Sequence, residues 1–319
     1  LTDSLNYDRL YDLGYYFEGG TLMDEENVLT SDWGEYSPAT KQSVFNHDVK
    51  LVNPKFVLTS DTLRYNTENK IAVILGPSNI VSDNNHIYSE RGFYNTLTEQ
   101  EKAEGWELLF DGETLDGWRD YNGTALTGPW EVVNGTIQAD GQGSDASGYI
   151  VTDKAYENFE LSWDWKISKG GNSGLLYHVV ERPQFPVPYV TGPEYQLIDD
   201  INFAEPLEDW QRCGVDYAMY LPDFNTIKVH PAGEWNNSKI IFDNGHVTYF
   251  MNGHKTVEFD AWSDDWFSRK NSGKWANAPE YGLAHKGLIC LQDHGYPAWF
   301  RNIKIKELPR KTREARLFK

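Results

Sequence analysis

Apolar and polar residues alternate along most of this chain, a pattern typical of half-buried β-strands. In residues 159–167 (FELSWDWKI), every second side chain is apolar and the side chains between them are polar. In residues 239–253 (KIIFDNGHVTYFMNG), two alternating runs flank Asn244-Gly245, the strongest short signal for a tight hairpin. No segment of any length repeats its apolar residues with the period of a helix. The pattern therefore predicts an all-β chain.

The first 96 residues repeat a short motif, which indicates stacked β-units with a shared core. Residues 3–7 (DSLNY) match residues 61–65 (DTLRY), and the same offset aligns residues 29–36 (LTSDWGEY) with residues 87–94 (IYSERGFY). Short alternating runs lie between Asn, Asp and Gly turns, as expected for strands. Fewer than two full repeats are present, so we expect residues 1–96 to be a β-repeat array cut off at its N-terminus.

The pattern changes at residues 97–104, where Glu and Gln dominate and predict a short linker or a single helical turn. Between residues 105 and 308, strand-like runs alternate with turns, and the natural solution is a two-sheet antiparallel sandwich. The last segment, residues 309–319, is basic and is expected to be a solvated tail. The expected architecture is thus a sandwich domain preceded by a short β-repeat segment.

Composition narrows the classes of function. The net charge is −19, and this argues against nucleic acid, whose phosphates need basic patches. No run of about 18 apolar residues is present, so no membrane-spanning helix is expected. Aromatic residues make up 14% of the chain, a high share that suits a β-rich, sugar-handling protein. The two cysteines, Cys213 and Cys290, could form a disulfide or remain buried thiols, and their sequence context leaves both open.

The strand-like stretch GPEYQLIDD (192–200) carries polar residues where apolar ones are usual. Side chains alternate along a strand, so Glu194 and Gln196 share one face while Tyr195 and Leu197 share the other. At about 3.3 Å per residue the first pair is roughly 6.6 Å apart, a spacing that suits contact with one sugar ring. We expect Glu194 and Gln196 to point into a binding cleft, the alternative being an ordinary solvated face.

Other polar residues are candidates for the same cleft. LQDHG (291–295) places Gln292 and His294 on one face, and a neutral imidazole is the usual group for proton transfer near neutral pH. His178 follows the same logic, and Asn172 lies in a glycine-rich loop where the backbone allows close approach. Each of these could also serve only a turn or a strand end.

The last predicted strand carries a charged residue on its expected core face. Residues 300–308 (FRNIKIKEL) place Arg301 on the same face as Ile303 and Ile305, which is the expected core side. A buried Arg needs a partner, and we expect either a carboxylate such as Glu194, a substrate oxygen or a structural ion pair. Trp235 is a candidate sugar-stacking platform, with core packing as the alternative.

Asp199 and Asp200, next to the candidate strand, could bind a divalent cation or cap a turn, and no other metal site is indicated. Neither supplies a nearby second carboxylate, because Asp200 lies about 20 Å along the strand from Glu194. Retaining and inverting glycosidases need carboxyl pairs about 5–9.5 Å apart. The spacing therefore disfavours ordinary glycoside hydrolysis unless a carboxylate arrives from another strand.

Six motifs in this region resemble the 3-keto-disaccharide hydrolase family, formerly a domain of unknown function. The motifs are WELLFDGETLDGW (106–118), GGNSGLLYHVVE (170–181), GPEYQLIDD (192–200), PAGEWNNSKI (231–240), LQDHG (291–295) and FRNIKIKEL (300–308). The resemblance implies a concanavalin A-like, two-sheet jelly-roll sandwich and cleavage of glycosides already oxidised to a ketone at C3. The sandwich glucanases of this fold carry an E-x-D-x-E strand, and this chain reads EYQLID instead.

The first 96 residues resemble the OstA-like, LptA-related repeats of Bacteroidetes cell-envelope proteins. SDTLRYN, LGPSNI and YSERGFYNT carry this resemblance. It implies a β-jelly-roll array, a possible partner in the envelope and a periplasmic or secreted location. The chain begins with LTDSLNYD, without Met or a signal segment, so we expect a mature or truncated form.

A 3-keto sugar needs only one base, since its ketone acidifies the hydrogen on C2. We expect Glu194 or His294 to be that base and the other to handle the leaving group, with Arg301 or a bound cation stabilising the enolate. Gln196, Gln292 and Asn172 would hold sugar hydroxyls. Two alternatives remain: a non-catalytic, lectin-like carbohydrate-binding module, and an envelope-structural protein that acts through its repeats.

Overall fold

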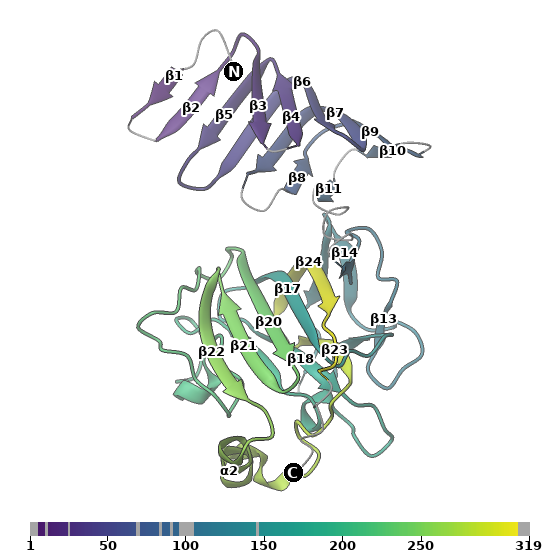
Figure 1. Ribbon diagram of the computed structural model, residues 1–319, viewed down its shortest axis with the longest axis vertical. Coiled ribbons are helices and arrows are strands. Elements are labelled where there is room, and N and C mark those ends of the chain that lie inside the picture. Colours follow the sequence, from purple (N-terminus) through teal and green to yellow (C-terminus); the bar gives the residue numbers. More distant parts are fainter. Residues whose placement is uncertain are drawn as a thin grey trace, which may run out of the picture. The chain divides into compact units, whose positions relative to one another are not determined.

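The fold is described from a computed structural model of the chain (Figure 1). It describes residues 6–9, 12–24, 26–67, 71–82, 85–89, 92–95, 105–144 and 147–311. The chain separates into two compact units, residues 1–104 and 105–319. The predicted linker, residues 97–104, and most of the basic tail lie outside the described residues.

The N-terminal unit is a single antiparallel sheet, in which the described strands follow the order β1-β2-β5-β6-β7-β8-β11 with two hairpins attached. Its long central strands β6 and β7 are paired over their length except for one irregularity between Asn46 and Val49. The strands are β1 (Asn6–Asp8), β2 (Leu13–Tyr16), β3 (Gly20–Asp24), β4 (Asn27–Ser31), β5 (Trp33–Ser37), β6 (Gln42–Asn53), β7 (Phe56–Asn66), β8 (Ile71–Ile74), β9 (Ser78–Ser82), β10 (Asn85–Ser89) and β11 (Gly92–Asn95).

Alternate residues of these strands form a small core, as the period-two pattern predicts. Leu29, Leu51, Leu58 and Leu63 are fully buried in it. The sequence repeat also reappears in the structure: the successive strands β4 and β5 correspond to the successive strands β10 and β11, at the same offset. The segment is therefore a β-repeat, as expected.

The C-terminal unit is a sandwich of two antiparallel sheets, which confirms the predicted all-β, concanavalin A-like jelly-roll class. The larger sheet has the order β14-β15-β24-β17-β20-β21-β22, with β12 on β24, and the smaller has the order β13-β16-β23-β18-β19 (Figure 1). The strands are β12 (Trp106–Leu108), β13 (Trp118–Asp120), β14 (Trp130–Val133), β15 (Thr136–Asp140), β16 (Tyr149–Thr152), β17 (Phe159–Ile167), β18 (Asn172–Val179), β19 (Glu194–Ile198), β20 (Asn236–Asp243), β21 (His246–Met251), β22 (His254–Asp260), β23 (Leu288–Asp293) and β24 (Pro297–Glu307).

The main core lies between the two sheets. The five apolar side chains of β17 are all buried in it, from Phe159 to Ile167. Tyr195 and Leu197 meet them from the smaller sheet, and both are fully buried. The predicted hairpin between β20 and β21 is also present, with Asn244 and Gly245 both at positive φ.

The C-terminal unit also contains a short helix that the hydrophobic pattern did not reveal. The helix α2 (Asp264–Ser272) begins at Ser263, whose side chain accepts a hydrogen bond from the Trp266 backbone N–H. Short 3-10 turns are η1 (Pro188–Val190), η2 (Asp209–Gln211) and η3 (Lys274–Asn277). Of α2 only Trp266 and Lys270 are buried, so a segment this short carries little apolar periodicity and only its cap marks it in the sequence.

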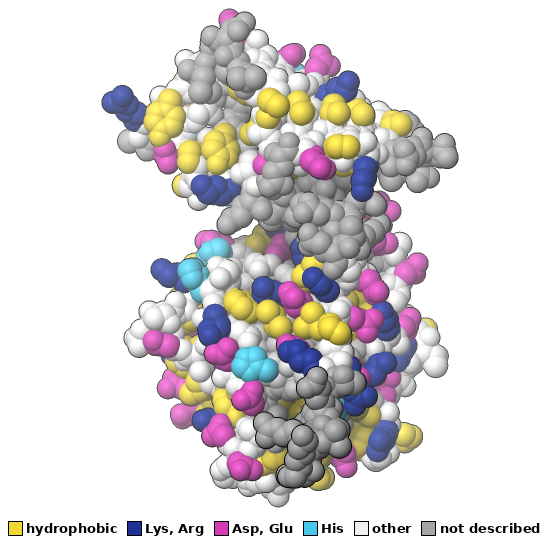
Figure 2. Space-filling view, in the orientation of Figure 1, with side chains coloured by type: hydrophobic (Ala, Val, Ile, Leu, Met, Phe, Trp, Pro, Cys, Tyr) yellow, Lys and Arg dark blue, Asp and Glu magenta, His cyan; other side chains and the backbone are white. Residues whose placement is uncertain are grey.

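The structure also decides the state of the cysteines. Cys213 and Cys290 are both buried free thiols, so the disulfide alternative is wrong. Among the described residues, no helix is both long and apolar enough to cross a membrane. On the face of the C-terminal unit seen in Figure 2, positive and negative side chains are interspersed rather than gathered by sign.

Candidate active site

A row of polar residues crosses three neighbouring strands of the smaller sheet. Strand pairing places Gly174 of β18 opposite Gln196 of β19 on one side and opposite Gln292 of β23 on the other. Glu194 lies two residues from Gln196, opposite Leu176. Glu194 and Gln196 are only 6% and 3% exposed, so the alternative of an ordinary solvated face is wrong. These side chains lie on the face opposite Tyr195, away from the sandwich core.

The missing side chain of Gly174 leaves space for the Glu194 carboxylate. A Cβ at residue 174 would overlap Glu194 Oε1 and would also lie 3.0 Å from Glu194 Cδ. The carboxylate therefore lies over the backbone of β18, between the Gln196 and Gln292 strands. Any residue larger than glycine at 174 would push it away.

A pocket of about 160 Å³ opens over this row. Five of its lining residues were expected from the sequence: Asn172, Glu194, Gln196, Gln292 and His294. Four were not: Tyr189, Tyr217, Lys274 and Trp275. The structure thus brings together five residues from three separate motifs into one concave site.

Three amide oxygens in the pocket are buried and have no hydrogen-bond partner in the structure: Asn172 Oδ1, Gln196 Oε1 and Gln292 Oε1. The orientation of the Gln196 amide is fixed, because its Nε2 donates to the Gln211 carbonyl at 3.1 Å. A buried acceptor without a donor costs about 1–3 kcal/mol, so such a cluster is expected to be completed by a ligand. Sugar hydroxyls are donors of the right kind.

The four lining residues that the sequence did not predict are three aromatic residues and one cation, Lys274. Lys274 Nζ donates to the Tyr217 hydroxyl at 3.1 Å and lies 4.3 Å from the centre of the Tyr217 ring. Trp275 Nε1 donates to the Tyr217 carbonyl, and Tyr217 N donates to the Glu194 carbonyl. Lys274 and Trp275 are thereby held at the pocket next to the strand that carries Glu194.

Comparison with known proteins identifies the family of this chain. Residues 105–306 match the family described as the 3-keto-alpha-glucoside-1,2-lyase-like domain, a match that covers most of the chain. The chain belongs to this family. Residues 1–61 match a second family, described as OstA-like protein. Both family resemblances noted in the sequence are thus confirmed, the second over residues 1–61.

Two proteins illustrate what this chain is similar to. A Bacteroides thetaiotaomicron protein named 3-keto-disaccharide hydrolase is 32% identical over 232 residues, covering 65% of this chain and 79% of that protein. A crystal structure from Parabacteroides distasonis, which carries a provisional description as a glycosyl hydrolase, is 47% identical. The match covers 67% of this chain and 99% of the Parabacteroides chain, with a TM-score of 0.63.

Arg301 is not among the residues that line the pocket. Its Nε lies 3.3 Å from Asp164 Oδ2, and its guanidinium lies 4.0 Å from the centre of the Trp235 ring. The expected shared face with Ile303 is wrong, because a bulge adds one residue to β24 and leaves Asn302 at positive φ. Arg301 thus has the structural ion pair that was one of its alternatives.

A second bulge removes His178 from the pocket face. Pairing between β18 and β23 shifts between Leu176 and Val179, and His178 has a φ of +52°. Its ring is 2% exposed, packs 4.4 Å from the Phe242 ring and makes a 2.8 Å hydrogen bond to the Glu157 carbonyl. His178 is therefore part of the core between the sheets.

We expect His178 to make the protein less stable in mild acid. Burial lowers the pKa of His178 from 6.5 to about 4. Between these values the unfolded chain binds a proton that the folded chain excludes, so the free energy of unfolding falls as the pH drops through this window. The free energy of unfolding falls by about 3 kcal/mol at most across this window.

Urea unfolding at pH 7, 5.5 and 4 measures this fall. In His178→Asn, whose new residue tolerates positive φ, we expect the free energy of unfolding to depend less on pH. An equal acid loss in the variant would contradict this role.

The remaining candidates also lie outside the pocket. Trp235 packs beneath two cations, Lys166 at 5.1 Å and Arg301. Asp199 accepts hydrogen bonds from Gly170 and Asn202, which hold its pKa low against the effect of burial. Asp200 accepts a hydrogen bond from the Cys213 backbone and pairs with Arg212 at 3.2 Å.

No group of three His, Cys, Asp or Glu side chains suited to a metal ion occurs among the described residues. Asp199 and Asp200 hold loops in place, so they are poor candidates for ligands. Hard cations such as Ca²⁺ and Mg²⁺ prefer carboxylate and amide oxygens. Glu194 with the three amide oxygens of the pocket is the set that could hold such an ion.

Proposed function

We propose that this pocket cleaves glycosides whose sugar carries a ketone at C3, by removing the C2 proton and expelling the group on C1. The observation that carries the proposal is a single buried carboxylate, Glu194, among amide oxygens that lack donors. The similar proteins support a glycoside hydrolase-like function, and the family description supports a lyase step.

Binding would be provided by the amides. Asn172, Gln196 and Gln292 each present a buried oxygen that accepts a hydrogen bond from a sugar hydroxyl. Trp275, Tyr189 and Tyr217 supply aromatic walls for the apolar faces of the ring. The sugar is thereby oriented with its C2 hydrogen toward Glu194.

In the first step, the Glu194 carboxylate takes the C2 proton, and the electrons of the C–H bond form an enolate with negative charge on the C3 oxygen. The Lys274 ammonium is the cation among the lining residues and stabilises this charge. In the second step, the enolate re-forms the ketone, a C1–C2 double bond forms, and the C1–O bond breaks.

The departing oxygen takes a proton from His294, which stands at the more exposed side of the pocket. Addition of water across the new double bond, with hydroxyl to C1 and hydrogen to C2, then completes a net hydrolysis. The roles left open by the sequence are assigned in this way because Glu194 is the more buried of the two groups.

A conventional glycosidase mechanism fits the pocket poorly. Retaining and inverting enzymes need two carboxyl groups about 5–9.5 Å apart on either side of the bond that breaks. Glu194 is the only carboxylate among the described residues that line the pocket. A lone carboxylate suffices when a ketone has already acidified the C2 hydrogen.

The direct test compares an oxidised with an ordinary disaccharide. We expect the purified protein to consume a 3-keto-disaccharide and to leave the unoxidised disaccharide intact over the same time. Binding of both sugars without consumption of either would instead identify a non-catalytic carbohydrate-binding module. Cleavage of the unoxidised sugar would identify an ordinary glycosidase.

The role of His294 predicts a dependence on the leaving group. For His294→Gln we expect turnover of a 3-keto-disaccharide to fall about 10²–10⁴-fold, because an alkoxide needs a proton to depart. A 3-keto 4-nitrophenyl glucoside, whose phenolate leaves unprotonated, should lose much less. The comparison of kcat for the two substrates checks this, and equal losses for both would show that His294 has a different role.

We further propose that the OstA-like segment places the enzyme in the cell envelope, in the periplasm or as a secreted protein, where it would also contact an envelope partner. The matched family and the β-repeat fold support this. Fractionation of the native host with an antibody tests the location. Deletion of residues 1–104 should leave turnover unchanged, because every residue that lines the pocket belongs to the C-terminal unit.

A further inference from the structure

Tyr217 lines the pocket directly beside Glu194. Tyr195 and Asp216 form an antiparallel bridge, and Tyr217 N donates to the Glu194 carbonyl at 2.9 Å, so Glu194 and Tyr217 are the next pair. Residues opposite each other in an antiparallel pair place their side chains on the same face, with Cβ atoms about 5 Å apart. Burial agrees with this pairing, because Tyr195 and Asp216 are both buried whereas Tyr217 lines the pocket together with Glu194.

The Tyr217 hydroxyl is a hydrogen-bond donor without an acceptor among the described residues. Its oxygen accepts a hydrogen bond from Lys274 Nζ at 3.1 Å, which uses a lone pair and leaves the hydroxyl hydrogen available. Donation by a charged group polarises the O–H bond, so the hydroxyl becomes a stronger donor. The pocket therefore contains a strengthened donor next to the carboxylate of Glu194.

Three aromatic rings hold the Lys274 ammonium against this hydroxyl. Lys274 Nζ lies 4.3 Å from the centre of the Tyr217 ring, 5.3 Å from that of Trp210 and 5.4 Å from that of Trp275. Each distance is within the range of a cation–π contact. Trp210 also packs edge-on against Tyr217, with ring centres 5.3 Å apart. Packing thus fixes both the donor and the cation, and such preorganised groups are the most effective at stabilising a developing negative charge.

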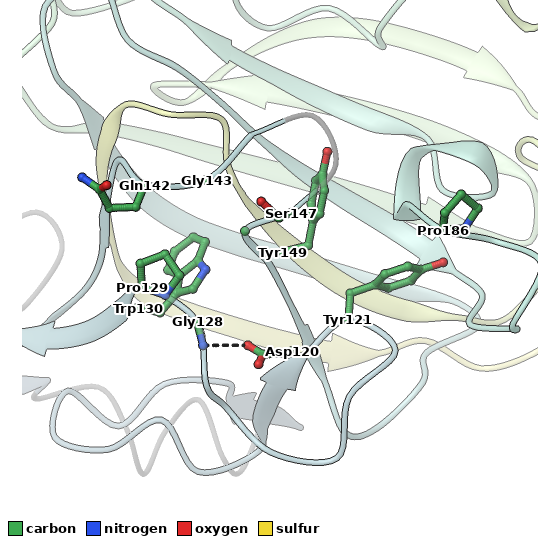
Figure 3. A pocket seen from close by; sticks show the side chains of 11 residues that line it. Asp120, Tyr121, Gly128, Pro129, Trp130, Gln142, Gly143, Ser147, Tyr149 and Pro186 are labelled. Atoms are coloured by element: carbon green, nitrogen blue, oxygen red, sulfur yellow. Dashed lines mark hydrogen bonds between the residues drawn. The ribbon is translucent and has the colours of Figure 1, made fainter.

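Two other tyrosines near the polar row do not offer the same group. Tyr121 and Tyr149 line a neighbouring pocket of about 310 Å³ (Figure 3), and neither lines the pocket around Glu194. The Tyr121 hydroxyl donates to the Phe185 carbonyl at 3.0 Å. The Tyr149 hydroxyl accepts a hydrogen bond from Gln292 Nε2 at 3.5 Å. Neither hydroxyl is therefore placed to reach a sugar beside Glu194.

Tyr217 and His294 lie on opposite sides of Glu194. The segment that carries Tyr217 pairs with one edge of β19, whereas β18 and then β23, which His294 follows, lie on the other side. In the sugar, C1 and C3 are the two ring neighbours of C2. A base at C2 therefore has the C1 group on one side and the C3 oxygen on the other. With His294 at the C1 group, Tyr217 is the residue on the side of the C3 oxygen.

From these contacts we propose that the Tyr217 hydroxyl donates a hydrogen bond to the C3 oxygen as the enolate forms. The inference rests on the proposed function and adds a catalytic residue to it. Glu194 takes the C2 proton, the electrons of the C–H bond form a C2–C3 double bond, and the π electrons of the ketone move to the C3 oxygen. The Tyr217 O–H bond stays intact. Lys274 acts on the new charge both directly and through this hydroxyl.

Tyr217→Phe tests this role, because it removes the hydroxyl and keeps the ring that packs against Lys274 and Trp210. We expect kcat for a 3-keto-disaccharide to fall about 10²–10³-fold, the effect of losing one donor to an oxyanion, and KM to change little. The loss should be of similar size for a 3-keto 4-nitrophenyl glucoside, because an enolate forms whatever the leaving group. This result would distinguish Tyr217→Phe from His294→Gln.

The isotope effect of deuterium at C2 provides the second measurement. Its value on kcat in Tyr217→Phe should equal or exceed that of wild type, because proton removal is the step that becomes slower. Tyr36→Phe, on β5 and outside the pocket, is the matched control and should leave both kcat and the isotope effect unchanged. Thermal melting of each variant checks that the fold is retained.

The outcomes separate this role from the proposed function. A wild-type kcat in Tyr217→Phe would overturn the role of the hydroxyl and leave the proposed function standing. So would a loss confined to the disaccharide, which would place Tyr217 at the leaving group, or an isotope effect below that of wild type. Failure of the wild-type protein to consume either 3-keto substrate would overturn the proposed function itself.

Discussion

Glu194→Gln is expected to lower kcat for a 3-keto-disaccharide by about 10²–10⁴-fold, because an amide of the same shape cannot accept the C2 proton. KM should change little, since the amide fills the same space above Gly174 and the hydroxyl acceptors of Gln196 and Gln292 are untouched. Steady-state kinetics on the purified variant measure both parameters.

A matched control separates loss of the base from loss of a charge. Glu258 lies exposed on β22 and does not line the pocket, so Glu258→Gln removes one negative charge outside the site and should leave kcat unchanged. The melting temperature of Glu194→Gln should equal or exceed that of wild type, because a buried charge is replaced by a neutral group. Wild-type turnover by Glu194→Gln would remove Glu194 from the mechanism.

Gly174→Ala is expected to reduce turnover about 10²-fold, the size of effect that a displacement of about 1 Å produces at a reacting group. The new methyl group would overlap the Glu194 carboxylate and force it out of its position between Gln196 and Gln292. Overpacking should also cost about 1–3 kcal/mol of stability, measurable by urea unfolding.

The double variant Gly174→Ala/Glu194→Asp tests this explanation. Aspartate is one methylene shorter, so its carboxylate withdraws from the added methyl group. We expect the double variant to be more stable than the sum of the two single effects predicts, which is the signature of residues in direct contact. Additive effects, or full activity in Gly174→Ala, would show that the close approach at residue 174 has no role.

Much of the fold follows from period-two alternation. It placed Tyr195 and Leu197 in the core and Glu194 and Gln196 on the opposite face, and the structure agrees because β19 is regular throughout. Alternation failed for His178 and Arg301, where a bulge turns one residue to the other side. The hydrophobic pattern alone did not mark those bulges, so the two residues were assigned to the wrong face.

The far wall of the site could not be predicted in the same way. Lys274 and Trp275 lie in a short 3-10 turn about 80 residues after Glu194 in the chain, and their position depends on Tyr217 and on stacking with Tyr281. These are tertiary contacts between irregular segments, which have no periodic pattern. The cap of α2 at Ser263 was a usable signal, but a nine-residue helix has too few buried positions to reveal its period.

The central claim is that the C2 proton is removed before the C1–O bond breaks. Its most direct measurement uses a 3-keto-disaccharide carrying deuterium at C2, incubated with the protein in ordinary water and analysed at early times by mass spectrometry. We predict that the 3-keto sugar produced has lost the C2 deuterium, at a rate well above that of free deuterated 3-keto-glucose incubated with the same protein. Full retention of deuterium in the product would contradict the account and point to direct displacement at C1.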